Sequence, residues 1–147
     1  MSTHRVEQAS RRRRGGVSVL AILGLSSLLV VPVYALSRLA ASVDWRILGA
    51  VPIVVSLLTF VAYRSDKRRA EAGEWRVPES TLHLAELAGG WPGAFLAQRT
   101  FRHKITKVSY QVEFWIIVVV HQIAALDSLV GWRFAKDVLH LIKAHIS

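Results

Sequence analysis

The chain has 147 residues, 52% of them hydrophobic, and carries a formal net charge of +9 at pH 7. It contains no cysteine, which excludes disulfide bonds, thiolate catalysis and cysteine-ligated metals. Apolar residues are gathered into long uncharged runs with the charges between them. The positive charge therefore indicates basic loops facing an anionic membrane surface, and nucleic-acid binding is not expected.

Two uncharged runs are long enough to cross a membrane as helices. Residues 1–16 are polar and basic and are predicted to be disordered. The runs 17–36 and 47–63 carry no charge, and a hydrocarbon core about 30 Å thick needs roughly 17–25 helical residues. The first run is longer than a signal-peptide core of about 7–15 residues. We therefore predict that it is an uncleaved span.

The second half of the chain holds a broken helix, a third span and a tail. Residues at about 78–98 are apolar but are interrupted by Gly-Gly-Trp-Pro-Gly at 89–93, a strong helix breaker. The third span is predicted at about 108–130. In the tail, 131–147, apolar residues recur at helical spacing, which predicts an amphipathic helix at the membrane interface.

Lysine and arginine are distributed unevenly among the segments between these helices. Fourteen of the nineteen lie in the N-terminal segment, in 63–80 and in 99–107. Cytosolic loops are enriched in these residues, so all three segments are expected on the cytosolic side of the bacterial inner membrane. A straight crossing by 81–98 would place 99–107 outside. We therefore predict an all-α, multi-pass membrane bundle with three full spans and one broken re-entrant or interfacial helix; four full spans are the alternative.

Four ordered motifs lie between the second and third spans. They are Asp-Lys-Arg-Arg-Ala at 66–70, Trp-Arg-Val-Pro-Glu at 75–79, Gly-Gly-Trp-Pro-Gly at 89–93 and Phe-Arg-His-Lys-x-x-Lys at 101–107. Together they resemble the core of the DUF1294 family of small bacterial membrane proteins, over about 55 of the 147 residues. The resemblance implies a membrane location and no established reaction. Some members carry a cold-shock domain before the membrane part; this chain has none, so nucleic-acid binding does not transfer.

An ion pair is predicted where the second span ends. Asp66 and Arg69 are three residues apart, so their side chains share one face of a helix. Asp66 has an alternative partner in Arg102 or Lys104, which would tie the two basic segments together. The remaining interpretation is a solvated cluster that stops transfer of the chain across the membrane.

Glu79, His83 and Glu86 are spaced to share one helical face and, with His103, are the candidate catalytic residues. The alternative interpretation is a polar stripe facing water. No metal site is predicted, because one histidine and two glutamates on a helix are a weaker signal than a His-Glu-x-x-His pair. The sequence has no Walker loop, nucleophile elbow or Rossmann fingerprint, and no cofactor is expected.

A second candidate site would bind an anion or an anionic lipid. The run 99–107 is basic and contains no acid, and glycines before it expose backbone N–H groups. The predicted members are Gly90, Gly93, Arg99, Arg102, His103, Lys104 and Lys107. The alternative interpretation is a helix end and turn beside a basic anchor to lipid headgroups. His121, within the third span, is predicted to have a structural role.

Three functions are compatible with these features. The first is a non-enzymatic membrane module that binds anionic lipid, another copy of itself or a different membrane partner. The second is a membrane-embedded enzyme acting on a lipid or a phosphorylated amphiphile. The third is a small transporter subunit, which would need to oligomerise because three or four spans are few for a pathway within one chain.

Overall fold

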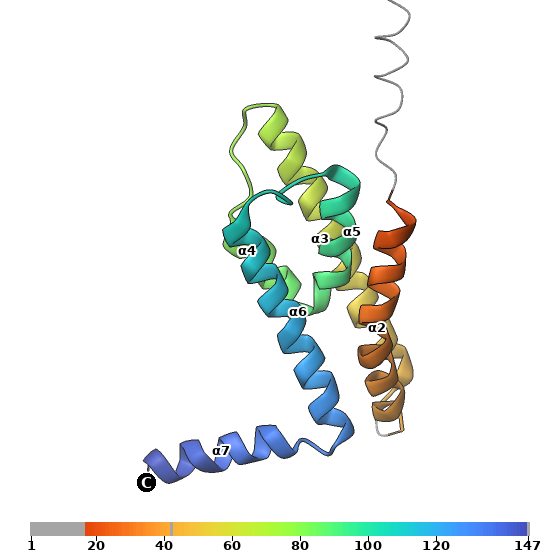
Figure 1. Cartoon of the computed structure of the whole chain (residues 1–147), viewed down its shortest axis with the longest axis vertical. Coiled ribbons are helices and arrows are strands. Elements are labelled where there is room, and N and C mark those ends of the chain that lie inside the picture. Colours follow the sequence, from red (N-terminus) through yellow and green to blue (C-terminus); the bar gives the residue numbers. More distant parts are fainter. Residues whose placement is uncertain (1–16, 42, 147) are drawn as a thin grey trace, which may run out of the picture.

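The computed structural model describes residues 17–41 and 43–146, so the predicted disorder of residues 1–16 lies outside the described part. In the described part the chain is all-α, which confirms the predicted fold class (Figure 1). Three helices are long and apolar enough to cross a membrane: α2 (Val19–Leu39), α3 (Trp45–Glu71) and α6 (Val108–Leu129). The other elements are α4 (Glu79–Ala85), η1 (Glu86–Gly90), α5 (Trp91–Phe101) and α7 (Arg133–Ile146).

Helix α3 extends two turns beyond the uncharged run that predicts it. It starts at the cap Asp44, whose carboxylate accepts a hydrogen bond from the Arg46 backbone, and it continues through the charged stretch to Glu71. Thr59 and Tyr63 of the uncharged run and Asp66 of the extension share one helical face, and all three are buried. The extension therefore carries the Asp66 carboxylate into the protein interior.

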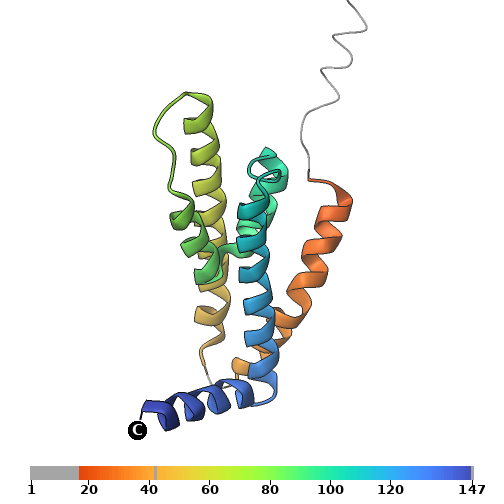
Figure 2. The same ribbon diagram turned by 60° about the vertical axis from the view of Figure 1, so that its left-hand side comes forward.

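The predicted broken helix forms a hairpin of two short limbs, α4 and α5, joined by the π-helical turn η1. Gly89 breaks the helix with a φ of 104°, and Pro92 lies in the first turn of α5. Both limbs open toward the same end of the bundle, and the bend lies part of the way along α3 (Figures 1 and 2). The segment 81–98 is therefore re-entrant in shape and does not run straight through.

Close backbone approach holds the hairpin against α3. A Cβ atom on Gly90 would overlap the side chain of Thr59, and one on Gly93 would overlap the backbone oxygen of Ser56. Helix α5 packs mainly against α3, while α2 packs mainly against α6. The α2–α6 contact includes a hydrogen bond from the Gln122 amide to the Leu28 carbonyl, 2.9 Å long. His121 contacts the Ile117 carbonyl of its own helix, at 2.9 Å.

Helix α7 lies across one end of the bundle, roughly perpendicular to α6 (Figure 2). Gly131 and Trp132 turn the chain with φ angles of 80° and 60°. Asp127, near the end of α6, accepts hydrogen bonds from the Phe134 and Ala135 backbones at 2.9 and 3.0 Å. The carboxylate thus caps the first turn of α7 and fixes its direction.

The two ends of the bundle differ in what they contain. The start of α2, the 72–78 connection and the 102–107 connection lie at one end, whereas the α2–α3 connection and α7 lie at the other (Figures 1 and 2). We call the first the basic end, because it carries both basic segments that follow α3 and α5. The buried side chains Tyr63, Leu82, Phe95, Tyr110 and Phe114 pack in the half of the bundle that contains the hairpin.

Candidate functional site

A network of polar side chains occupies the interior between α3, the hairpin and the start of α6. Its inner part is centred on Glu86, whose side chain is fully buried. Tyr63 and Tyr110 donate hydrogen bonds to the same oxygen, Glu86 Oε1, the second of them over 3.1 Å. Their hydroxyl oxygens are 2.5 Å apart, and the Gln98 amide donates to Tyr63 Oη over 3.1 Å. Four segments distant in sequence are thus joined at one carboxylate.

His83 extends this inner part to the surface. Its Nδ1 lies 2.8 Å from the second oxygen of Glu86, and its Nε2 lies 3.1 Å from Glu113 Oε2. The His83 side chain is 12% exposed and that of Glu113 is 61% exposed. The ring lies against Tyr110, with 4.1 Å between ring centroids. A continuous row therefore runs from a buried carboxylate through an imidazole to an exposed carboxylate.

The outer part of the network is centred on Asp66, which is also fully buried. Its carboxylate accepts a 3.0 Å hydrogen bond from the Val77 backbone and lies 2.8 Å from His103 Nε2 and 3.3 Å from Lys104 Nζ. Arg69 is exposed. The predicted Asp66–Arg69 pair is therefore wrong, and the alternative partner Lys104 is present. Asp66 lies on the buried face of α3, and Arg69 does not.

Glu79 joins the same outer part. It lies 3.3 Å from Lys104 Nζ and 2.5 Å from Lys107 Nζ. Hydrogen bonding to Lys107, and then the charge of Lys104, hold the pKa of Glu79 below its ordinary value. The basic run lacks an acid in sequence, but folding supplies two of them, Asp66 and Glu79. The positive charges of Lys104 and Lys107 are therefore paired with acids from other segments.

The candidate catalytic residues fall into the two parts of the network. His83 and Glu86 are hydrogen-bonded in the inner part, while Glu79 and His103 lie in the outer part. Lys104 connects the parts, since its Nζ lies 4.8 Å from the centroid of the Tyr110 ring. In the described residues, no group of three or more His, Asp or Glu side chains is placed to hold a metal ion.

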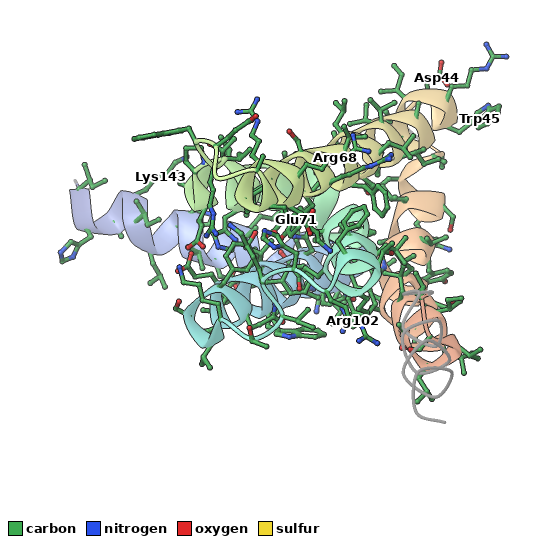
Figure 3. The ribbon with its side chains drawn as sticks, turned by 90° about the horizontal axis from the view of Figure 1, so that it is seen from above. Asp44, Trp45, Arg68, Glu71, Arg102 and Lys143 are labelled. Atoms are coloured by element: carbon green, nitrogen blue, oxygen red, sulfur yellow. The ribbon has the colours of Figure 1, made fainter. Side chains whose placement is uncertain are left out.

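The residues of the predicted anion site are not brought together. Gly90 and Gly93 face α3, which occupies the space beside them. Arg102 follows the other end of α5, a helix of 11 residues and about 16 Å. Its side chain is exposed and lies on the far side of α5 from α3 (Figure 3). The cradle of glycine N–H groups and Arg102 is therefore absent from the described structure, because the two features lie at opposite ends of one helix.

Arg99 has different surroundings from the other basic residues. Its guanidinium carbon lies 3.4 Å from the centroid of the Phe95 ring, and Nη1 donates to the Phe95 carbonyl over 3.3 Å. Burial lowers the pKa of Arg99, and within residues 17–41 and 43–146 it forms no ion pair with an acid. Of the predicted anion-binding residues, Arg99 thus combines partial burial with an uncompensated charge.

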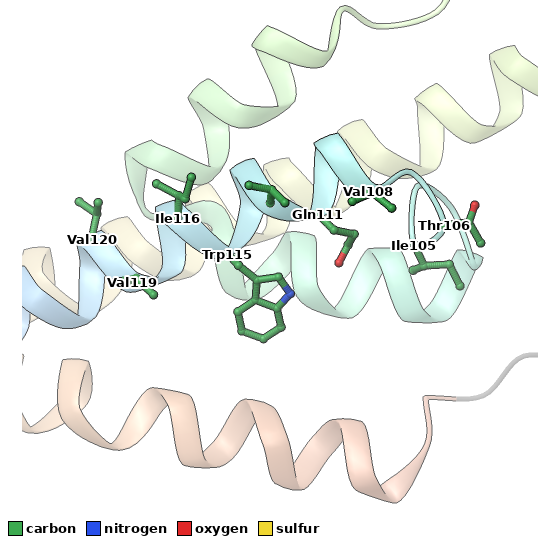
Figure 4. A pocket seen from close by; sticks show the side chains of 9 residues that line it. Ile105, Thr106, Val108, Gln111, Trp115, Ile116, Val119 and Val120 are labelled. Carbon is green, nitrogen blue, oxygen red and sulfur yellow. The ribbon is translucent and has the colours of Figure 1, made fainter.

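Arg99 borders an open groove of about 480 Å³ between α2, α5 and α6. The α2 wall includes Ser18 and Gly24, and Trp115 of α6 closes the opposite side. A second open groove, about 610 Å³ and almost entirely apolar, follows the outer face of α6 (Figure 4). Trp115 lines both grooves.

Sequence reasoning missed several members of the network. Tyr63, Gln98 and Tyr110 lie in segments that the sequence identifies only as apolar, and Glu113 is not among the predicted site residues. One signal for Tyr63 was present: it lies three residues before Asp66 and four after Thr59, on the same helical face. Gln98 and Tyr110 become significant only when the hairpin folds back on α3.

Comparisons with known proteins match the region of the chain that contains the network. A family model described as "Protein of unknown function (DUF1294)" matches residues 56–110. The matched stretch runs from the middle of α3 through the hairpin to the start of α6 and holds all of the network except Glu113. No solved structure matches the chain.

A curated relative also matches part of the chain. The "Uncharacterized protein YsdA" of Bacillus subtilis (strain 168) is 31% identical over 77 residues, which are 52% of this chain and 86% of the relative. The match therefore extends over nearly the whole of that protein. This chain belongs to the DUF1294 family.

Proposed function

We propose that this chain is a non-enzymatic module of the inner membrane that holds an anionic lipid at its basic end, with Arg99 as the headgroup ligand. In this proposal the basic end and the N-terminus face the cytosol, as the distribution of lysine and arginine favours. The proposal rests chiefly on Arg99, a half-buried cation without an acidic partner among the described residues.

A half-buried guanidinium such as that of Arg99 is energetically unfavourable without a counter-ion. Burying an ionised group costs several kcal/mol, roughly, unless it is paired and hydrogen-bonded. Lys104 and Lys107 reduce that cost by pairing with acids of the chain. The π face of Phe95 partly stabilises the Arg99 guanidinium, whose remaining donors are able to bind a phosphate.

The groove beside Arg99 has the chemistry of a lipid site. Its walls combine a cation with apolar groups of Leu20, Phe95 and Trp115, and Gly24 leaves space on α2. The groove includes Ser18, next to the start of α2, and it shares the lining residue Trp115 with the apolar groove along α6 (Figure 4). A headgroup at Arg99 would therefore place an acyl chain along α6, in the direction of the bilayer.

The alternative of a membrane enzyme would use His83 or His103 as an acid or base. Each of these histidines already contacts a buried carboxylate, and neither lines the groove at Arg99. This arrangement favours binding over catalysis.

Substitution of Arg99 tests the proposal. The protein is inserted into bilayer discs made of phosphatidylglycerol and phosphatidylcholine, and retained lipids are counted by native mass spectrometry. Arg102→Gln is the matched control, since Arg102 is an exposed cation of the same segment. Losing one surface charge is expected to weaken binding of anionic lipid by about 1 kcal/mol, which is roughly fivefold in affinity. We expect Arg99→Gln to lower retention of phosphatidylglycerol by more than this and Arg102→Gln by no more. Equal effects of the two variants would overturn the proposal.

A further inference from the structure

We propose that the inner part of the network is a proton-binding site, in which Glu86 takes up a proton from the basic end through Glu113 and His83. This inference is independent of the lipid site, because none of its residues lines the groove at Arg99.

The first argument is a count of hydrogen atoms. Tyr63, Tyr110 and Glu86 approach one another pairwise, and His83 approaches Glu86 with one ring nitrogen and Glu113 with the other. These are five short contacts between polar heavy atoms, and each contact needs one hydrogen atom to become a hydrogen bond. Two hydroxyls and one neutral imidazole supply only three. With both glutamates ionised, two approaches are left as contacts between lone pairs.

One added proton reduces this deficit. A proton on Glu86 Oε2 supplies the hydrogen of the approach to His83 Nδ1, and the imidazole hydrogen then lies on Nε2, facing Glu113. The same proton held on His83 would let both ring nitrogens donate to carboxylates. The arrangement of side chains is therefore that of a network carrying at least one proton beyond the fully ionised state.

The second argument is charge. The groups that contact Glu86 are Tyr63 from α3, His83 from α4 and Tyr110 from α6, and Gln98 from α5 contacts Tyr63 beside it. None of these is a lysine or arginine. The nearest cation of the network, Lys104, lies over the Tyr110 ring and is shared by Asp66 and Glu79. A fully buried carboxylate without a fixed cation is stabilised by taking up a proton or by a protonated histidine.

The third argument is a route to solvent. Glu113 is exposed and contacts His83 Nε2, while His83 Nδ1 contacts Glu86. A proton passes from the Glu113 carboxyl to Nε2 and forms the Nε2–H bond. The Nδ1–H bond breaks, and that proton joins Glu86 Oε2. Glu113 is again a carboxylate, Glu86 is neutral, and the imidazole has changed tautomer without net gain or loss.

Infrared difference spectroscopy in lipid discs, between about pH 8 and about pH 5, tests this inference over the range in which histidine changes charge. The wild-type chain should gain the C=O stretching band of a protonated carboxyl, and Glu86→Gln should lose that band. The amide introduced by this substitution would bring its own hydrogens, so the variant can keep the network closed. Glu113→Gln should retain the band but exchange its proton for deuterium more slowly. His121→Gln, which alters a histidine of α6 outside the network, should match the wild type.

A carboxyl band that persists unchanged in Glu86→Gln, or the lack of any such band in the wild type, would overturn the proposal. If Glu86→Gln fails to fold, nitrogen NMR of labelled histidine in the wild-type chain decides instead. The His83 signals, assigned by their loss in His83→Gln, should show the ring hydrogen on Nδ1 in the basic sample and on Nε2 in the acidic sample. A ring that keeps its hydrogen on Nδ1 throughout that range, with no carboxyl band, contradicts the inference.

Discussion

Single buried side chains contribute more to the stability of this structure than the exposed charged residues do. Asp66 contacts two segments at once: the Val77 backbone in the connection after α3, and His103 and Lys104 in the connection after α5. Removing one partner of a buried ion pair leaves the other charge buried and unpaired. Asp66 therefore ties the connection that precedes the hairpin to the one that follows it.

Asp66→Ala should accordingly be strongly destabilising. Lys104 would keep its burial and lose one of its two acids, and the Val77 N–H would lose its acceptor. We expect a loss of about 3–5 kcal/mol, read as a lower melting temperature in detergent. Glu71→Ala is the control, because Glu71 is 66% exposed and lies 3.6 Å from Lys67. Its loss should be about 0–1 kcal/mol. Similar melting temperatures for the two variants would mean that Asp66 behaves as a solvated residue.

At the level of elements, glycine determines how closely the hairpin approaches α3. Gly93 is in helical conformation, and its missing side chain leaves room for the backbone of Ser56. A backbone oxygen cannot move aside as a flexible side chain can. The closeness of α5 to α3 in turn brings Gln98 to Tyr63 and places Glu86 between the tyrosines.

Gly93→Ala should therefore destabilise the chain, although alanine favours helices. Helix propensity alone would add about 0.5–1 kcal/mol of stability. Overlap with α3 should remove about 1–3 kcal/mol or more, so the net change is a loss. Gly49→Ala is the matched control in α3, where an added Cβ meets nothing within 4 Å. Thermal melting of the two variants should move in opposite directions, and a Gly93→Ala protein that melts at or above the wild type would contradict this packing.

The elements differ in how well sequence predicts them. Apolar stretches predict α2 and α6, because membrane thickness sets their length. The same criterion ends α3 too early, since Asp66 and its neighbours look like a loop until a buried partner is known. The motif Gly-Gly-Trp-Pro-Gly indicates that the helix breaks, but it does not indicate the direction in which the second limb of the hairpin, α5, continues. Partners such as His103 for Asp66 lie 37 residues away in sequence and depend on that direction.

At the scale of the whole molecule, the hairpin shape of 81–98 leaves three candidate spans, an odd number. Three helices are long enough to span, and the hairpin returns to the end from which it enters. The basic segments after α3 and α5 therefore share one end, and α7 lies at the other (Figure 1). Four full spans would instead separate the two basic segments by a membrane.

Chemical labelling can determine the orientation directly, because the chain has no cysteine of its own. Ala72→Cys and Thr106→Cys introduce thiols at exposed positions of the basic end, and Ala144→Cys introduces one on α7. Fourteen of nineteen basic residues belong to the N-terminal segment and the segments around these first two positions. The positive-inside tendency therefore predicts that a membrane-impermeant maleimide added to intact cells labels Ala144→Cys and spares the other two. Permeabilised cells, in which all three thiols should react, control for accessibility.

Labelling of Thr106→Cys but not Ala72→Cys in intact cells would show that the hairpin crosses the membrane. Labelling of both, with Ala144→Cys protected, would keep the hairpin and reverse the orientation, which would move the Arg99 groove to the outer leaflet.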